Sequence, residues 1–544
     1  MKEKRKRARK ADSPEDIDAG NGFVGAKNSN NENNKGDAGN NALSLCREAR
    51  ALWLKHATER EDMEMVEDLY RRALNAKKVV LSKTSTNSKK QKRKRKQVET
   101  SASLTRKTVA ALSPEEYRKA GERLSLLYLQ SSRSFKATMG LKYLGFECRL
   151  SEKILNYPTG AAAAAATLAS HSRNGKHSKN KKTKMKHHNK ESKNDPLLQP
   201  PCCVVDDFLS PIELHHLRKI FGDVDSTYWS SHDYIIDKEP PAPYFSYVID
   251  LKQQQQQQQQ HEEHGSSNGH GKKTQRSFVR RIIDKILRSG EVAATFPNLR
   301  RDAKHVEMWA HNRPHASGHQ LHFDSDDEGR SRQEGGFPNH PLCSVVLNVS
   351  SHPRVGGPTL VTNQRLRNPE TTNLRSVVGW LVPSRPSRLV CFDGSVLHGV
   401  VPGKGPIPRT AIEDGGATPR PRRVTLMMAF WKDIRVRHSP KPGSARPWPL
   451  PSSSRPHLPA WARELNRTDV HHRGLEESGS APSAVPREQT RRQQRERDEH
   501  VQIIPVPRVY ELLDGTPVPK YNDDDGMDGG GYYMPEYDKV FQGF

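Results

Sequence analysis

His322 and Asp324 stand two residues apart in the stretch LHFDSDDEGR (residues 321–330), and they are candidates for metal chemistry. Successive side chains of a β-strand point to opposite faces, so residues two apart share a face. An imidazole and a carboxylate would then enter the same space. A second histidine, His398, ends another apolar stretch, RLVCFDGSVLHGVV. Two histidines and one carboxylate on one face leave about three positions of an octahedral metal open, which suits non-haem Fe(II) and O2 chemistry.

An arginine pair opens the next apolar stretch, RRVTLMMAFW (residues 422–431). A guanidinium group can hold a carboxylate through two parallel hydrogen bonds, and each charged hydrogen bond contributes about 1.5–3 kcal/mol. A 2-oxo acid that chelates a metal at one end needs such an anchor at its other end. We favour Arg423 because the apolar strand begins immediately after it, and Arg422 stays open as the alternative.

The order of these residues resembles that of the Fe(II)/2-oxoglutarate-dependent dioxygenases, and in particular their prolyl-4-hydroxylase-like branch. The resemblance covers roughly residues 200–435, under half of the chain. It rests on the H-x-D pair, the distant histidine and the arginine. It rests also on three similar segments: VVDDFLSPIEL (204–214), VVLNVSSHPRVGGPTLV (345–361) and PSRPSRLVCFDGSVLHGVVPGKG (383–405).

The resemblance implies a role for each matching residue. His322, Asp324 and His398 become the iron ligands at the catalytic centre, and Arg423 becomes the partner of the distal carboxylate of 2-oxoglutarate. Cofactor-binding roles are also implied for two further residues: Thr359 in the Gly-Gly-Pro-Thr run, and Trp309, which replaces a tyrosine common in the family. More residues separate His398 from Arg423 along the sequence than is usual in the family, and we interpret the residues between them as a loop insertion.

The activity implied is hydroxylation of a C–H bond with release of succinate and CO2, using O2, 2-oxoglutarate and Fe(II), with ascorbate as a candidate reductant. A protein side chain such as proline is the substrate we favour. A nucleic-acid base oxygenase or demethylase is the second candidate, although Ala429 stands where dealkylating relatives carry a second arginine. A basic scaffold protein that has lost its metal is the non-enzymatic alternative.

Two other metal interpretations of this region fit poorly. In a calcium loop that begins at Asp324, position twelve would be Gly335, where a bidentate glutamate is required. Three histidines at four-residue spacing would share one face of a helix, but Pro314 and Gly318 oppose a helix there. We predict that these three are loop histidines, with the rim of the site as the alternative: His311, His315 and His319.

Charge and hydropathy limit the classes of protein that fit. The 544 residues carry a formal net charge of +26, only 33% are hydrophobic, and the mean hydropathy is −0.88. Such a charge favours nucleic acid or acidic partners, which the basic tracts can contact. No apolar run approaches the roughly 20 residues of a membrane span. Six cysteines without a C-x-x-C pair indicate free thiols in a reducing compartment. Basic tracts such as KKQKRKRKQ (89–97) predict a nuclear or nucleolar location, and otherwise a cytoplasmic one.

The fold that we predict is mainly β. Many short apolar stretches separated by Gly and Pro turns after residue 301 indicate a sandwich or barrel. With the resemblance, this becomes a double-stranded β-helix (jelly-roll) core with flanking helices, an N-terminal helical module and long disordered tails. Two interpretations of the module stay open: it recruits a partner, or it packs on the barrel. The predicted parts are a disordered basic, Asn-rich tail (1–41), the helical module interrupted by a basic tract (42–160), a low-complexity basic linker (161–197), the dioxygenase domain (198–437) with a polyglutamine loop insertion (252–275), and a mostly disordered tail (438–544).

Overall fold

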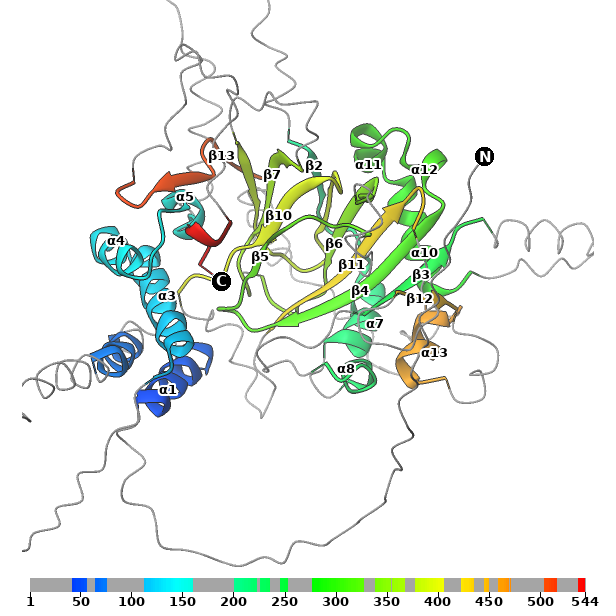
Figure 1. Cartoon of the computed structure of the whole chain (residues 1–544). Helices are drawn as coiled ribbons and strands as arrows, with labels where there is room; N and C mark the ends of the chain where they lie inside the picture. Colours follow the sequence, from blue (N-terminus) through cyan, green and yellow to red (C-terminus); the bar gives the residue numbers. More distant parts are fainter. Residues whose placement is uncertain are drawn as a thin grey trace, which may run out of the picture.

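The structure is a computed structural model of the chain, a mixed α/β arrangement with several sheets (Figure 1). The predicted tail 1–41 and linker 161–197 lie outside the described residues, as do nearly all of the polyglutamine insertion and the loop before Arg422. The residues described are 42–55, 64–75, 112–159, 200–222, 226–234, 245–252, 276–326, 338–353, 355–366, 377–405, 422–434, 445–449, 458–468, 470, 503–515 and 537–543.

The largest sheet has seven strands, and its centre is the antiparallel pair β4 (His305–Arg313) and β11 (Arg423–Trp431). These two strands pair along their whole lengths, with Arg313 opposite Arg423 and His305 opposite Trp431. The sheet order is β12-β3-β4-β11-β6-β9-β2. The remaining strands are β12 (Ala445–Trp448), β3 (Ser246–Asp250), β6 (Cys343–Asn348), β9 (Leu389–Phe392) and β2 (Cys202–Val205).

A five-stranded sheet faces the first one across a shared interior. The chain crosses between the two sheets repeatedly, since β4, β6, β9 and β11 belong to the larger sheet and β5, β7, β8 and β10 to the smaller. Apolar side chains from both sheets fill part of the interior, among them Val346, Val361 and Val390 with Trp380. The order is β13 (Ile504–Val506), β8 (Gly379–Val382), β7 (Thr359–Arg365), β10 (Val396–Val400) and β5 (His319–His322).

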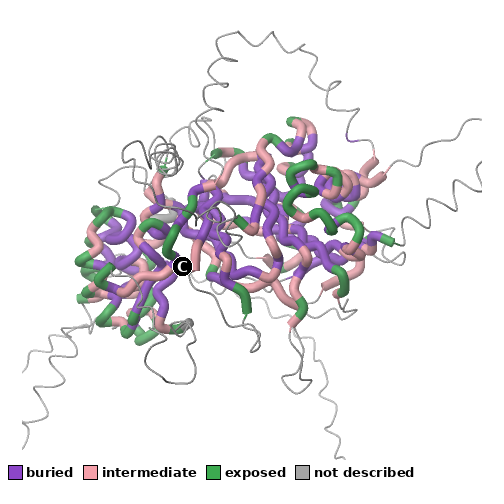
Figure 2. Tube along the Cα trace, turned by 90° about the horizontal axis from the view of Figure 1, so that it is seen from above, coloured by how far each residue is buried: buried purple, intermediate pink, exposed green. Residues whose placement is uncertain are grey.

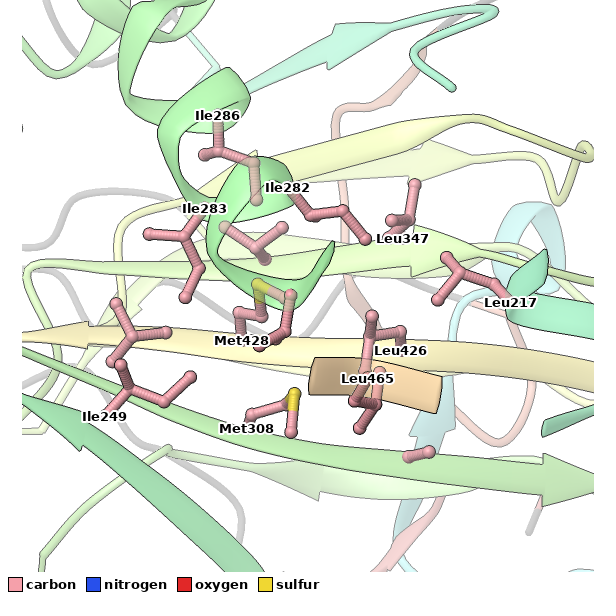
Figure 3. Packing of buried hydrophobic residues seen from close by; sticks show 14 of the residues in the cluster. Leu217, Ile249, Ile282, Ile283, Ile286, Met308, Leu347, Leu426, Met428 and Leu465 are labelled. Carbon is pink, nitrogen blue, oxygen red and sulfur yellow. The ribbon is translucent and has the colours of Figure 1, made fainter. Parts of the chain in front are cut away.

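Helices cover the outer face of the seven-stranded sheet. Helix α7 (Pro211–Phe221) begins with the capping box that the sequence predicts, in which Ser210 and Glu213 exchange hydrogen bonds. Figure 3 shows apolar side chains of α10 (Phe278–Arg288) lying over the β11 residues Leu426 and Met428. Each such buried side chain contributes about 1.5–3 kcal/mol to stability. The layer is completed by α8 (Thr227–Ser230), α11 (Gly290–Thr295), α12 (Leu299–Asp302) and α13 (Ala460–Asn466).

The N-terminal helices pack against the outer face of the five-stranded sheet. One apolar cluster joins helical residues such as Leu127 to Leu360 and Leu381 of that sheet. Of the two interpretations of the helical module, the structure therefore shows the packed layer. Figure 2 shows buried segments in the central strands and exposed residues on the outer side of this helical group. The elements are α1 (Ala42–Lys55), α3 (Pro114–Gln130), α4 (Ser134–Tyr143) and α5 (Glu152–Leu155), with the three-stranded sheet β14 (Tyr510–Leu512), β1 (Cys148–Leu150) and β15 (Val540–Phe541).

Several short segments after residue 437, within the predicted mostly disordered tail (438–544), belong to the described part of the chain. Where the structure describes them, β12 pairs in parallel with β3, and β13 pairs with β8. Two tryptophan rings from this part, Trp448 and Trp461, lie 5.8 Å apart between their centroids within the main apolar cluster. These strands are short, and the strands with which they pair are far away along the chain. No local sequence pattern therefore predicts them. Among the described helices, none is both long and apolar enough to cross a membrane.

Candidate metal centre

The pairing of β5 with β10 places His322 opposite His398. Asp324 follows two residues after β5 ends, and its Oδ1 lies 3.6 Å from the Nε2 atom of each histidine. The two imidazole centroids are 4.4 Å apart, and one ligand atom from each of the three residues lies within 4.8 Å of the others. The structure thus brings together the three residues that the sequence singles out as metal ligands.

Backbone carbonyl groups orient both imidazole rings. The Nδ1–H of His322 donates to the carbonyl oxygen of Gln320 at 2.8 Å, and the Nδ1–H of His398 donates to that of Val396 at 3.0 Å. Because Nδ1 carries the proton, Nε2 keeps its lone pair and is the atom that can bind a metal. The Nε2 atom of His398 is buried and has no hydrogen-bond partner within the described chain. An unpaired buried acceptor of this kind fits a metal position.

Asp324 is held in a similar way from the opposite sheet. Its Oδ2 accepts a 2.6 Å hydrogen bond from the Ser344 hydroxyl on β6, which leaves Oδ1 directed to the two imidazoles. Ser344 is not among the predicted site residues, although strand alternation along CSVVLN places it on the same face as Val346. Burial lowers the pKa of His398 to about 4, against the opposing effect of the Asp324 carboxylate. Its imidazole is therefore neutral near pH 7, which is the form that ligates metals.

Arg423 lies on the interior face of β11, and only 3% of it is exposed. Its Nη2 donates to the Thr359 hydroxyl at 3.1 Å, so two residues predicted to bind the cofactor touch each other. Gly356 packs on the same side chain with φ +78°, and a Cβ there would meet the arginine Cδ at 2.3 Å. Arg422 instead donates from Nε to the Asn312 side chain at 2.6 Å, on the other face of the strand pair. The geometry therefore favours Arg423 over Arg422 as the residue facing the interior.

Trp309 lies on the same face of β4 as His311, and its indole N–H donates to the His311 Nε2 at 3.2 Å. Its ring packs with Ala429 and Trp431, farther along the strand pair. The indole N–H is therefore already used in a hydrogen bond within the protein.

The prediction of loop histidines is wrong for His311 and His319. His311 belongs to β4, and His319 opens β5, because Pro314 and Gly318 exclude a helix but leave extended strands on both sides of a short turn. His315 lies in that turn, where its Nδ1 accepts from the Gly356 backbone N–H at 3.0 Å. His311 and His319 are thus close to the metal centre, with the His319 and His322 rings 4.4 Å apart.

The donor set fits a divalent metal such as Fe(II). Two imidazole nitrogens and one carboxylate oxygen meet in one place, and the other polar atom of each of these side chains is already used in a hydrogen bond. This combination on one side of a metal is that of the non-haem iron oxygenases.

Solved structures of oxygenases resemble part of this chain. A prolyl-4-hydroxylase from Pseudomonas putida is 15% identical, covers 44% of this chain and 96% of its own, and has a TM-score of 0.22. HygX from Streptomyces hygroscopicus, solved with nickel and 2-oxoglutarate bound, is 11% identical, with coverages of 45% and 91% and a TM-score of 0.22. A 2OG-Fe(II) oxygenase family member from Burkholderia pseudomallei is 10% identical, with coverages of 29% and 60% and a TM-score of 0.18.

Structural similarity to the 2OG-Fe(II) oxygenases is therefore found, but it is partial and its TM-scores are low. No protein-family model matches the sequence, and no curated protein does. The function proposed below consequently rests on the side chains of this chain.

Proposed function

We propose that the protein is an Fe(II)- and 2-oxoglutarate-dependent dioxygenase that hydroxylates a C–H bond. The observation that supports it is the convergence of the His322 and His398 Nε2 atoms on Asp324 Oδ1, with each side chain held by a hydrogen bond through its other polar atom. In this proposal, strands β4 to β11 are the eight strands of a double-stranded β-helix. Fe(II) with 2-oxoglutarate would supply O2 activation, which yields the hydroxylated product, succinate and CO2.

The protein's own groups bind and orient. His322, Asp324 and His398 would hold the metal, and the orienting hydrogen bonds would keep the ligands in position when it is absent. Arg423, with Thr359 beside it, would hold the carboxylate of 2-oxoglutarate that is remote from the metal. The guanidinium group of Arg423 keeps its charge near pH 7, since burial lowers its pKa only to about 10.

A protein side chain, such as proline in a nuclear or nucleolar protein, is the substrate that we propose. The basic sequence tracts support a nuclear or nucleolar location, and ascorbate would serve as reductant. The net charge of +26 supports a nucleic-acid base as the second candidate. A screen of basic peptides and single-stranded oligonucleotides for stimulated succinate release would separate the two.

The test of the activity class is an anaerobic titration of the full chain with Fe(II) and then 2-oxoglutarate. We expect a visible charge-transfer band that saturates at one metal per chain. The variants His322→Ala and Asp324→Ala should lose the band and 2-oxoglutarate turnover. His305→Ala, at the far end of β4 from the site, is the matched control and should retain both. A wild-type chain that binds iron but gives no band with 2-oxoglutarate would contradict the proposed function, and a chain that binds no iron would favour the scaffold alternative.

A further inference from the structure

A second guanidinium group, that of Arg313, lies beside Arg423 on the interior face of the seven-stranded sheet. The two residues are direct partners in the antiparallel pairing of β4 and β11. Direct partners place their side chains on the same face, about 5 Å apart at Cβ. The charge of Arg313 lowers the pKa of Arg423, as a second cause after burial. Two cations therefore lie side by side behind the metal centre.

Neither cation has a carboxylate partner among the residues that the structure describes. Arg313 donates from Nη1 to the Gly318 carbonyl at 2.9 Å, and Arg423 donates from Nη2 to Thr359. In both side chains, Nε is buried and has no hydrogen-bond partner in the described part of the chain. Burying a cation without a counter-ion is costly, so two such groups together indicate a place that an anion occupies in the working protein.

Another buried arginine, Arg388, is bound differently from Arg313 and Arg423. Arg388 donates to both carboxylate oxygens of Asp206, at 2.6 and 3.0 Å. The guanidinium of Arg388 therefore has a carboxylate partner. Arg313 and Arg423 keep unused donors instead.

Imidazole rings connect the two arginines to the metal ligands. The His319 ring lies 4.4 Å from that of His322, and the His311 ring lies 5.4 Å from that of His319. His311 is also close enough to Arg313 and Arg423 for their charges to lower its pKa, after burial. A ligand that runs from the metal ligands to the arginines would thus meet nitrogen-bearing groups along its length.

We propose that Arg313 is a specificity-determining residue for the oxo acid, and that Arg313 and Arg423 together hold its remote carboxylate between two guanidinium groups. The inference rests on the proposed function and adds to it a requirement for a dicarboxylate. A single arginine would donate to the carboxylate from one side, whereas two arginines donate from both sides. A 2-oxo monoacid, which has an apolar end, would leave both cations unpaired.

The test is calorimetric binding of two oxo acids to the full chain loaded with Mn(II) under anaerobic conditions. The acids are 2-oxoglutarate and 2-oxovalerate, which has the same chain length but no remote carboxylate. Arg313→Gln should weaken 2-oxoglutarate binding about 10-fold or more, the loss of at least one charged hydrogen bond. The same variant should bind 2-oxovalerate with an affinity within about twofold of that of the wild type. Arg422→Gln, the same change on the neighbouring face, should alter neither affinity.

Three outcomes would overturn the inference: unchanged 2-oxoglutarate affinity in Arg313→Gln, equal weakening of both acids, or the same loss in Arg422→Gln. If Arg313→Gln fails to fold by circular dichroism, Arg313→Lys takes its place. Arg313→Lys keeps the positive charge but lacks the forked N–H donors of a guanidinium group. It should lower the affinity for 2-oxoglutarate by about threefold and leave that for 2-oxovalerate unchanged. An unchanged affinity for 2-oxoglutarate in this variant also overturns the inference. Wild-type protein that holds Mn(II) but binds neither acid would instead count against the proposed function.

Discussion

The two faces of the β4–β11 strand pair differ in the kind of side chain that they carry. The outer face carries apolar residues such as Met308, Leu426 and Met428, which pack under α10 in the main core. The inner face carries His311, Arg313 and other polar groups, several of whose atoms have no partner in the described chain. Strand alternation alone separates the two sets. The outer face packs into the main core, and we propose that the inner face binds a ligand.

One polar group on the outer side, the imidazole of His232, is fully hydrogen-bonded. His232 sits among the aromatic side chains of the main core, stacked on Phe245 at 3.8 Å between centroids. Its Nδ1 is bonded to the Tyr228 carbonyl and its Nε2 to the Tyr247 hydroxyl. A polar group in the structural core thus has both nitrogens satisfied, whereas His311 leaves Nδ1 buried and unpaired.

The largest effect that we expect comes from truncating the outer face. Leu426→Ala removes a fully buried side chain and should lower the free energy of unfolding by about 3 kcal/mol, through lost burial and the cavity left behind. Urea unfolding followed by circular dichroism measures it. Thr425→Val, the neighbour on the inner face, is the matched control. Its hydroxyl is buried without a partner, so its removal should cost under about 1 kcal/mol. Equal losses in the two variants would remove the contrast between the faces.

A second expected effect is a loss of stability in acid that depends on His232. Burial, the largest cause, lowers the pKa of this imidazole from 6.5 to about 4, with Arg446 also lowering it. Between these values the unfolded chain binds a proton that the folded chain does not, so stability falls as the pH falls. The loss should reach about 2 kcal/mol at pH 5 relative to pH 7.5.

The measurement is urea unfolding across this pH range for the wild type and for His232→Phe. His232→Phe loses two hydrogen bonds and should be less stable than the wild type. The part of the pH dependence of the unfolding free energy that comes from His232 should be absent in this variant. An unchanged slope would mean that the outer-side imidazole is not held in its neutral form.

The smallest expected effect is on the inner face. Arg423→Met replaces a buried cation with an apolar side chain of similar length, so the ligand-free protein should keep its stability or gain about 1 kcal/mol. Thermal unfolding without metal or oxo acid checks this. A loss comparable with that of Leu426→Ala would show that Arg423 is part of the structural core, and the proposed carboxylate anchor would then need another residue.

Local patterns predicted the parts of the molecule that local physics determines. The capping box at Ser210, the strand that begins at Arg423 and the common face of His322 and Asp324 all follow from spacing along a single element. That His398 pairs opposite His322 depends on which strands become neighbours. The sequence offers His398 as a second ligand at the end of an apolar stretch, and the family resemblance supports that choice, but local spacing does not give the strand pairing.

Other features could not be predicted because they depend on contacts between distant segments. The β12 segment contains Arg446 and Pro447 and has no strand pattern, yet it pairs with β3. Ser344 is one polar residue in an apolar strand, and its role becomes visible only when Asp324 is beside it. Pro314 and Gly318 suggest a loop for the histidines before the site, but these two residues interrupt the strands only at the turn between β4 and β5.

The central claim is that His322, Asp324 and His398 bind one metal ion. The most direct measurement is a crystal structure of the chain loaded anaerobically with Fe(II), with anomalous data collected on both sides of the iron absorption edge. We predict one strong anomalous peak at bonding distance, about 2.0–2.2 Å, from the Nε2 atoms of both histidines and from the Asp324 carboxylate. A peak elsewhere in the chain, or none at full iron loading, would contradict it.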